Sequence, residues 1–111
     1  LGFGVLTGKY IDGIIPKGSR LEVMPNYKRY TSIECAKATK MYFELARENG
    51  LTLTELALSF VSERSFVVSN IIGATSLTQL KENIGSYKIK LSEEILSEID
   101  NIHSKIPNPA V

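Results

Sequence analysis

Four segments with helical patterning and only one clear strand make up this sequence, and that ratio limits the possible folds more than any other feature. The run 66–72 is rich in β-branched residues and stops at Gly73, so it predicts a short strand. The Gly-rich stretch 1–10 could be the end of a second buried strand that opens into a loop. One or two parallel strands do not form a stable sheet alone, because parallel sheets need cover on both faces. We therefore predict an α/β fold of which this chain is one mostly helical portion.

Capping residues and apolar spacing delimit the four predicted helices, which cover residues 32–49, 52–63, 76–84 and 92–102. Thr52 and Glu55 form a capping box, and Ser76 and Gln79 form another. Residues 11–31 carry Pro and Gly but no apolar period, so they predict a long connecting loop. The spacing in the third helix predicts that its buried side carries Leu77, Leu80 and Ile84.

Length and charge exclude several classes of partner. The chain has 111 residues and a net charge of +1, which is the length of one domain and gives no electrostatic case for nucleic acid or an anionic membrane as a partner. No stretch approaches the ~18 apolar residues of a transmembrane helix. Cys35 is the single cysteine and residues 1–10 lack the pattern of an export signal, so we expect a reducing, cytoplasmic location. The chain starts at Leu1 rather than Met, and we expect it to be part of a longer polypeptide.

The residues that follow the predicted strand form a candidate binding site. Gly73 allows close backbone approach, and the hydroxyl-bearing turn after it leads into a helix whose first amides attract anions such as phosphate. Gln79, Glu82 and Asn83 fall on one side of that helix, where they offer groups suited to an oxyanion and a purine edge. The alternative is structural: Ser76 and Gln79 could form a cap only, and the others could be surface residues.

Two cations elsewhere in the sequence could meet a phosphate. Lys9 follows the Gly-rich opening and Arg20 ends the segment Gly18-Ser-Arg. Taken singly, each is more commonly a solvated surface charge. Metal-ligand spacing and a Ser-His-Asp set are absent, so the sequence predicts neither a metal site nor a catalytic residue.

Two blocks of sequence resemble the aldo-keto reductases, especially their Tas-like and potassium-channel β-subunit-like branches. Residues 1–10 (LGFGVLTGKY) resemble the segment after strand seven of that family, and residues 72–83 (IGATSLTQLKEN) resemble its cofactor segment after strand eight. The resemblance implies the C-terminal portion of a (β/α)8 barrel that reduces aldehydes or ketones with NADP(H). Residues 1–111 would then comprise the end of strand seven, a cofactor-covering loop, helix seven, strand eight, helix eight and a C-terminal helix.

The resemblance also implies roles for ten residues toward NADP(H). Those expected along the pyrophosphate and other phosphates are Leu1, Gly2, Gly4, Lys9 and, at the 2′-phosphate, Arg20. Those expected at the adenosine ribose, 2′-phosphate and adenine are Gly73, Thr75, Gln79, Glu82 and Asn83. Many members carry a Lys-Ser pair and an Arg along this second segment, where the present chain has Gly73-Ala74 and Gln79. That departure leaves more of any preference for NADP over NAD to Arg20.

The catalytic Asp, Tyr, Lys and His of the family have no match in these residues, so we expect the 111 residues to be inactive alone. The carbonyl substrate would be bound through the complete barrel. Two alternatives remain open from the sequence. In the first, four amphipathic helices with little sheet to cover form a non-catalytic assembly module that self-associates. In the second, which the resemblance to the potassium-channel-associated branch suggests, the chain is a regulatory binding module.

Overall fold

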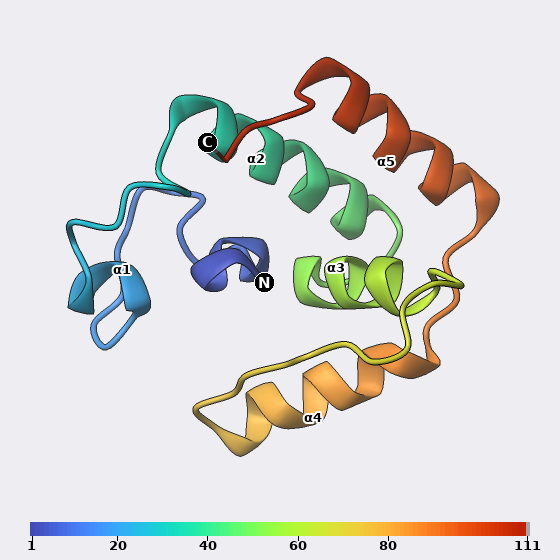
Figure 1. The fold of residues 1–111 in the computed structure, drawn as a ribbon, viewed down its shortest axis with the longest axis horizontal. Helices are drawn as coiled ribbons and strands as arrows, with labels where there is room; N and C mark the ends of the chain where they lie inside the picture. The colour runs from blue at the N-terminus through green and yellow to red at the C-terminus, as the bar shows by residue number, and fades with distance from the viewer. Residues whose placement is uncertain (111) are drawn as a thin grey trace.

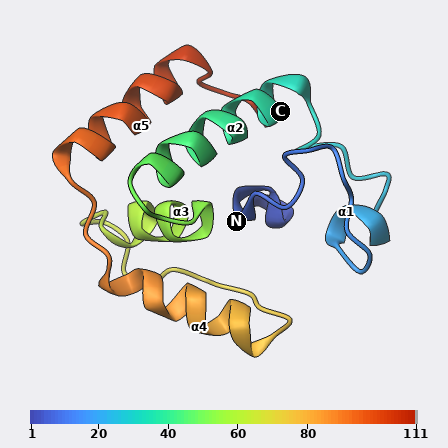
Figure 2. The same cartoon turned by 180° about the vertical axis from the view of Figure 1, so that it is seen from behind.

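The computed structural model describes residues 1–110, and every regular element in that range is helical. The helices are η1 (Gly2–Thr7), α1 (Arg20–Val23), α2 (Ile33–Glu48), α3 (Leu53–Ser62), α4 (Leu77–Gly85), η2 (Ser86–Lys88) and α5 (Glu93–Lys105). Figure 1 shows α3 near the middle, with α2 and α5 on one side of it and α4 on the other. Turned to the back, Figure 2 shows η1 lying between α1 and α3.

The longer helices start where their capping residues predict. Ser32, Thr52, Ser76 and Ser92 each precede a helix, and each side chain accepts a hydrogen bond from a backbone N–H of the first turn. Thr52 and Glu55 complete the predicted capping box in both directions. The predicted bounds therefore agree with the observed ones to within a few residues.

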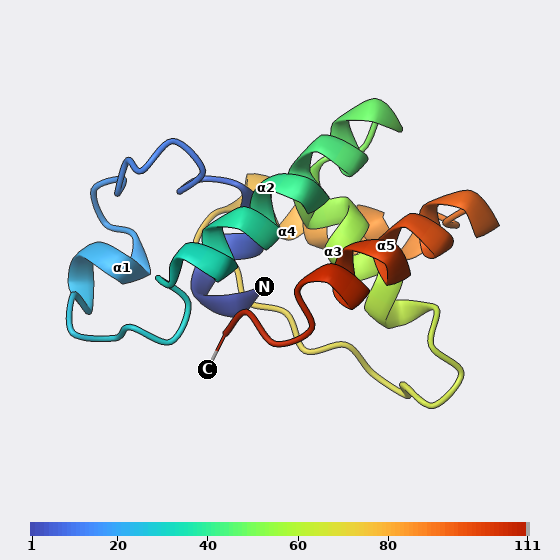
Figure 3. The ribbon, with the colours of Figure 1, turned by 90° about the horizontal axis from the view of Figure 1, so that it is seen from above.

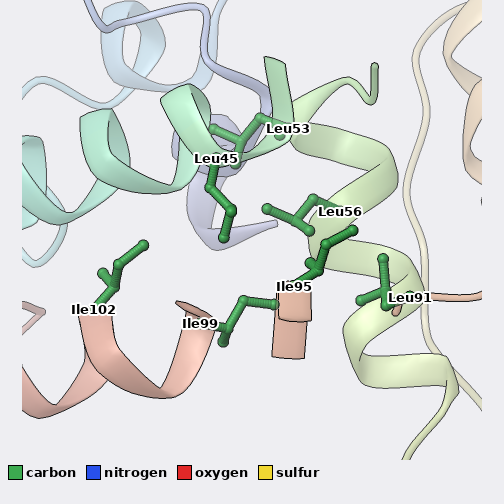
Figure 4. Packing of buried hydrophobic residues seen from close by; sticks show 8 residues of the cluster. Leu45, Leu53, Leu56, Leu91, Ile95, Ile99 and Ile102 are labelled. Carbon is green, nitrogen blue, oxygen red and sulfur yellow. The ribbon is translucent and has the colours of Figure 1, made fainter. Parts of the chain in front are cut away.

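One apolar cluster joins α2, α3 and α5. It comprises Leu45, Ala46, Leu53, Leu56, Leu91, Ile95, Ile99 and Ile102. Figure 4 shows these side chains pointing into the space enclosed by the three helices. Seen from above in Figure 3, α1 and its flanking loops lie at the opposite end of the molecule from most of α5. The cluster therefore stabilises the bundle without occupying the region around η1 and α1.

The predicted strands are not confirmed in residues 1–110. Residues 66–72 form no regular element, and the segment runs beside α4 in Figures 1 and 2. A strand is defined by hydrogen bonds to a neighbouring strand, and no described segment supplies one to this stretch. Ile71 is accordingly 94% exposed. In the stretch 1–10, Gly2–Thr7 form the short helix η1 and a turn follows, rather than the end of a strand.

The predicted buried side of α4 is wrong. Leu77 and Ile84 are exposed and Leu80 is only partly covered, whereas Asn83 is buried. The helix packs against α3 and η2, and its buried residue is the polar Asn83. Directly after α4, the Ser86 carbonyl of η2 accepts a hydrogen bond from the buried Ser59 hydroxyl of α3. Residues 1–110 leave Leu77 and Ile84, two of the three apolar residues of α4, largely uncovered. The spacing of the leucines identified the helix but not which side would be covered.

Candidate functional site

A cavity of about 350 Å³ opens between η1, α1, α3 and the segment that leads into α4. Nine of the ten residues expected at a cofactor line it: Leu1, Gly4, Lys9, Arg20, Gly73, Thr75, Gln79, Glu82 and Asn83. Gly2 is the exception. The volume lies in the range of ordinary small-ligand pockets. Residues from two segments that are more than 50 positions apart in the sequence thus meet at one place.

Gly4 provides room for the Lys9 side chain at this cavity. Its backbone has φ +88°, a left-handed conformation that favours glycine. A Cβ at this position would lie only 2.8 Å from Lys9 Nζ and 2.7 Å from its Cε. The Thr7 hydroxyl donates to the Gly4 carbonyl at 2.7 Å, which holds the turn closed. The glycine therefore leaves a space that the lysine ammonium uses.

Aromatic rings support Arg20. Its guanidinium carbon lies 5.4 Å from the centre of the Phe3 ring, which is within the range of a cation–π contact. On Phe3 the Tyr27 ring stacks at 4.0 Å between centroids, with 4° between the ring planes. Phe3 itself has φ 58°, which is uncommon for a residue with a side chain. The strained backbone and the stack together place a cation at the cavity.

Ser19 lies beside this arginine and was not among the residues that the sequence singled out. It precedes α1, but its side chain makes no capping hydrogen bond. It lines the cavity, is 6% exposed, and its Oγ is buried with no hydrogen-bond partner within the described residues. Buried hydroxyls are nearly always hydrogen-bonded, so this one marks an unmet donor and acceptor.

The turn before α4 is held by Gln79. Its Oε1 accepts from the Thr75 backbone N–H at 2.9 Å and from the Thr75 hydroxyl at 3.1 Å. The predicted second capping box is thus half present: Ser76 accepts from Gln79 N, but the Gln79 side chain bonds to Thr75. Because the amide oxygen is engaged twice, the NH₂ end is what remains to donate to an anion. The structural and the binding interpretations of Gln79 are compatible.

The two residues expected at adenine are both tied to neighbouring elements. Asn83 donates from Nδ2 to the Gly73 carbonyl at 3.4 Å. The Thr52 hydroxyl donates to Glu82 Oε1 at 2.8 Å, so this carboxylate is fixed to the start of α3. A second cavity of about 560 Å³ shares five lining residues with the first: Thr7, Lys9, Thr54, Gln79 and Glu82. Arg47 of α2 also lines that second cavity.

Other reactive groups lie away from the cavity. Cys35 is buried, and burial raises the pKa of its thiol above the ordinary value of 9.0 while a hydrogen bond from Thr39 partly opposes this.

Within residues 1–110, no group of three or more His, Cys, Asp and Glu side chains gathers in a way that could hold a metal ion. None of the helices described is both long and apolar enough to span a membrane.

Sequence comparisons agree with the resemblance found from the two motifs. The model of the "Aldo/keto reductase family" matches residues 1–104. "Protein tas" of Escherichia coli K12 is 43% identical over 110 residues, which are 99% of this chain and 32% of that protein. The "Putative voltage-gated potassium channel subunit beta" of Schizosaccharomyces pombe is 34% identical, over 94% of this chain and 32% of that protein. The "L-glyceraldehyde 3-phosphate reductase" of Escherichia coli K12 is 31% identical, over 90% of this chain and 30% of that protein. The chain therefore spans about a third of the length of these relatives.

Proposed function

Because the chain belongs to the aldo/keto reductase family, we propose that it is the C-terminal portion of an NADP(H)-dependent oxidoreductase that reduces aldehydes or ketones to alcohols. Family membership implies a (β/α)8 barrel, and these residues would supply its last βα unit and the cofactor-covering loop. The observation that carries the proposal is the convergence of nine expected cofactor residues on one cavity.

Two features of the cavity suit a ligand that bears phosphate. The space beside Lys9 is one that a Cβ at Gly4 would fill, so the ammonium can approach the backbone closely. Next to Arg20, the Ser19 hydroxyl is buried and has no hydrogen-bond partner among residues 1–110. An ammonium, a guanidinium and hydroxyl donors are the groups that proteins use for phosphate.

The residues of this chain would hold and orient the cofactor. Lys9 would pair with a phosphate of the pyrophosphate, and Arg20 would offer its planar fork to the 2′-phosphate. Glu82 and Asn83 would recognise the adenine edge, with Glu82 kept in place by Thr52. When bound, NADPH supplies a hydride for a carbonyl carbon. The family's catalytic Asp, Tyr, Lys and His have no match in these residues, so the acid that protonates the carbonyl oxygen would come from outside them.

Equilibrium binding of NADPH and NADH to the purified natural protein that contains these residues tests the proposal. We expect Arg20→Ala to weaken NADPH binding more than NADH binding, and Lys9→Ala to weaken both. Lys17→Ala is the matched control, since Lys17 is exposed in the same loop and does not line the cavity. Failure of the wild-type protein to bind either nucleotide would overturn the proposal. Turnover of an aldehyde by the 111 residues alone would contradict the assignment of the acid to residues elsewhere.

A second candidate, a self-associating helical module, is favoured by one observation. Phe66, Val68 and Ile71 project from an irregular segment, and each is at least 80% exposed. Contiguous exposed apolar surface marks interaction sites. We propose self-association as a property of the isolated chain rather than as its biological role.

A further inference from the structure

We propose that the Ser19 hydroxyl is a ligand for the 2′-phosphate of the cofactor and that, with Arg20, it determines the preference for NADP(H) over NAD(H). The inference rests on the proposed function and adds a residue that neither the motifs nor the family resemblance assigns.

The Ser19 hydroxyl makes no hydrogen bond within the described part of the fold. Ser19 is 6% exposed and its Oγ has no hydrogen-bond partner within residues 1–110. Its backbone is fully engaged: the N–H donates to the Pro16 carbonyl, and its own carbonyl accepts from Glu22 and Val23. An unpaired buried hydroxyl destabilises a fold. Ser19 therefore contributes nothing to the fold through its side chain that alanine would not.

Ser19 lies at the cavity where the expected cofactor residues meet. Ser19 lines the same cavity as Arg20, Thr75 and Gln79. No hydrogen bond within residues 1–110 holds its side chain, so the hydroxyl can donate to a group in the cavity without giving up another partner. The nearby Glu22 carboxylate accepts from the Gly18 backbone N–H and makes no hydrogen bond to Ser19 Oγ. The hydroxyl is thus available to donate to an anion held by the adjacent guanidinium.

The 2′-phosphate, rather than the pyrophosphate, is the partner that we infer for Ser19. The residues expected at the pyrophosphate come from η1 and Lys9, whereas Arg20 is expected at the 2′-phosphate. Gly73-Ala74 and Gln79 replace the cationic and hydroxyl groups that many relatives place near that phosphate. A hydroxyl next to Arg20 supplies a donor where this chain otherwise has few.

The experiment measures dissociation constants of NADPH and NADH for the purified natural protein and its Ser19→Ala variant. We expect Ser19→Ala to weaken NADPH binding about tenfold, the value of one hydrogen bond to a charged group, and to leave NADH binding unchanged. Ser19→Thr keeps a hydroxyl and should retain most of the affinity for NADPH. Thermal unfolding without nucleotide should show Ser19→Ala to be as stable as the wild type or more so.

Ser92→Ala is the matched control, because Ser92 precedes α5 and its hydroxyl does cap that helix. It should lower stability and leave both affinities unchanged, the reverse of Ser19→Ala. Equal loss of NADPH and NADH affinity in Ser19→Ala, no loss of either, or a loss of stability would each overturn the inference. If the wild-type protein binds neither nucleotide, the proposed function itself fails, which separates the two results.

Discussion

At the scale of single residues, Gly4 makes the sharpest prediction about the cavity. Gly4→Ala places a Cβ in a left-handed backbone and against the Lys9 side chain. We expect a loss of roughly 1–2 kcal/mol in the free energy of unfolding from the backbone strain, together with weaker NADPH binding because Lys9 is displaced. Chemical denaturation and nucleotide titration measure the two effects separately.

Gly13→Ala provides the control for that substitution. Gly13 also has a positive φ, +73°, but a Cβ there would meet nothing within 4 Å. It should lose similar stability and keep its affinity for NADPH. Equal affinities for NADPH in the Gly4→Ala and Gly13→Ala variants would show that Lys9 does not bind NADPH at this cavity.

Cys35 makes a prediction about pH. Burial raises the pKa of its thiol above 9.0, so the folded state binds this proton more tightly than the unfolded state. A raised pKa gives stability that is complete below the unfolded value and is lost as pH rises through the folded value. We therefore expect the free energy of unfolding to fall as pH rises above about 9, and Cys35→Ala to remove that part of the decline.

The Cys35 measurement is a series of urea denaturation curves between about pH 8 and pH 10. Tyr42 is the control, because its pKa is raised above 10.0 by burial and then by Asp100, so Tyr42→Phe should change the decline only at higher pH. A Cys35→Ala variant whose stability declines like that of the wild type over this range would contradict the prediction.

At the scale of elements, Thr52 links the start of α3 to α4. Its Oγ accepts from the Glu55 N–H at 3.1 Å and donates to Glu82 Oε1 at 2.8 Å. We expect Thr52→Ala to lose about 1–2 kcal/mol of stability, from the cap and from the link. Thr52→Ser keeps the hydroxyl and should stay close to wild type.

A double-mutant cycle with Glu82→Ala separates the link from the cap. Because the two side chains share a hydrogen bond, the double variant should lose less stability than the sum of the single variants. Strict additivity in chemical denaturation would mean that Thr52 acts on α3 alone and does not position Glu82.

The same elements explain how much of the fold the sequence could predict. Caps such as Ser32 and Ser92 are local signals, so helix positions followed from a few neighbouring residues. A strand depends on a partner that is distant along the chain, and residues 66–72 have none within residues 1–110. The covered side of α4 likewise depends on what packs against it, so apolar spacing alone misplaced Leu77 and Ile84.

The sequence grouped residues that lie together, and their role at a cofactor stays a prediction. Motifs placed nine residues on the cavity because their order and chemistry resemble those of a family. Ser19 and Phe3 were missed because their signals are three-dimensional: an unpaired hydroxyl in one case, a stack on Tyr27 in the other. The only sequence clue to Ser19 was its place beside Arg20.

At the scale of the whole molecule, the uncovered segment 66–72 leads to the last prediction. Val68 and Ile71 are almost fully exposed. In a closed barrel each strand pairs with two others and packs against helices, so the proposed barrel would cover these side chains. The isolated 111-residue chain has no such cover and should associate with itself as its concentration rises.

Sedimentation velocity over a range of concentrations measures that association. The double variant Val68→Lys and Ile71→Lys should shift the isolated chain toward monomer, because two buried charges oppose the contact. Ile33→Lys is the control, since Ile33 is exposed on α2, away from this segment, and should not change the association. In a longer protein that forms the proposed barrel, the same double substitution should instead prevent folding, because the lysines would enter its sheet. A wild-type chain that stays monomeric at every concentration would show that residues 66–72 are not a surface for self-association.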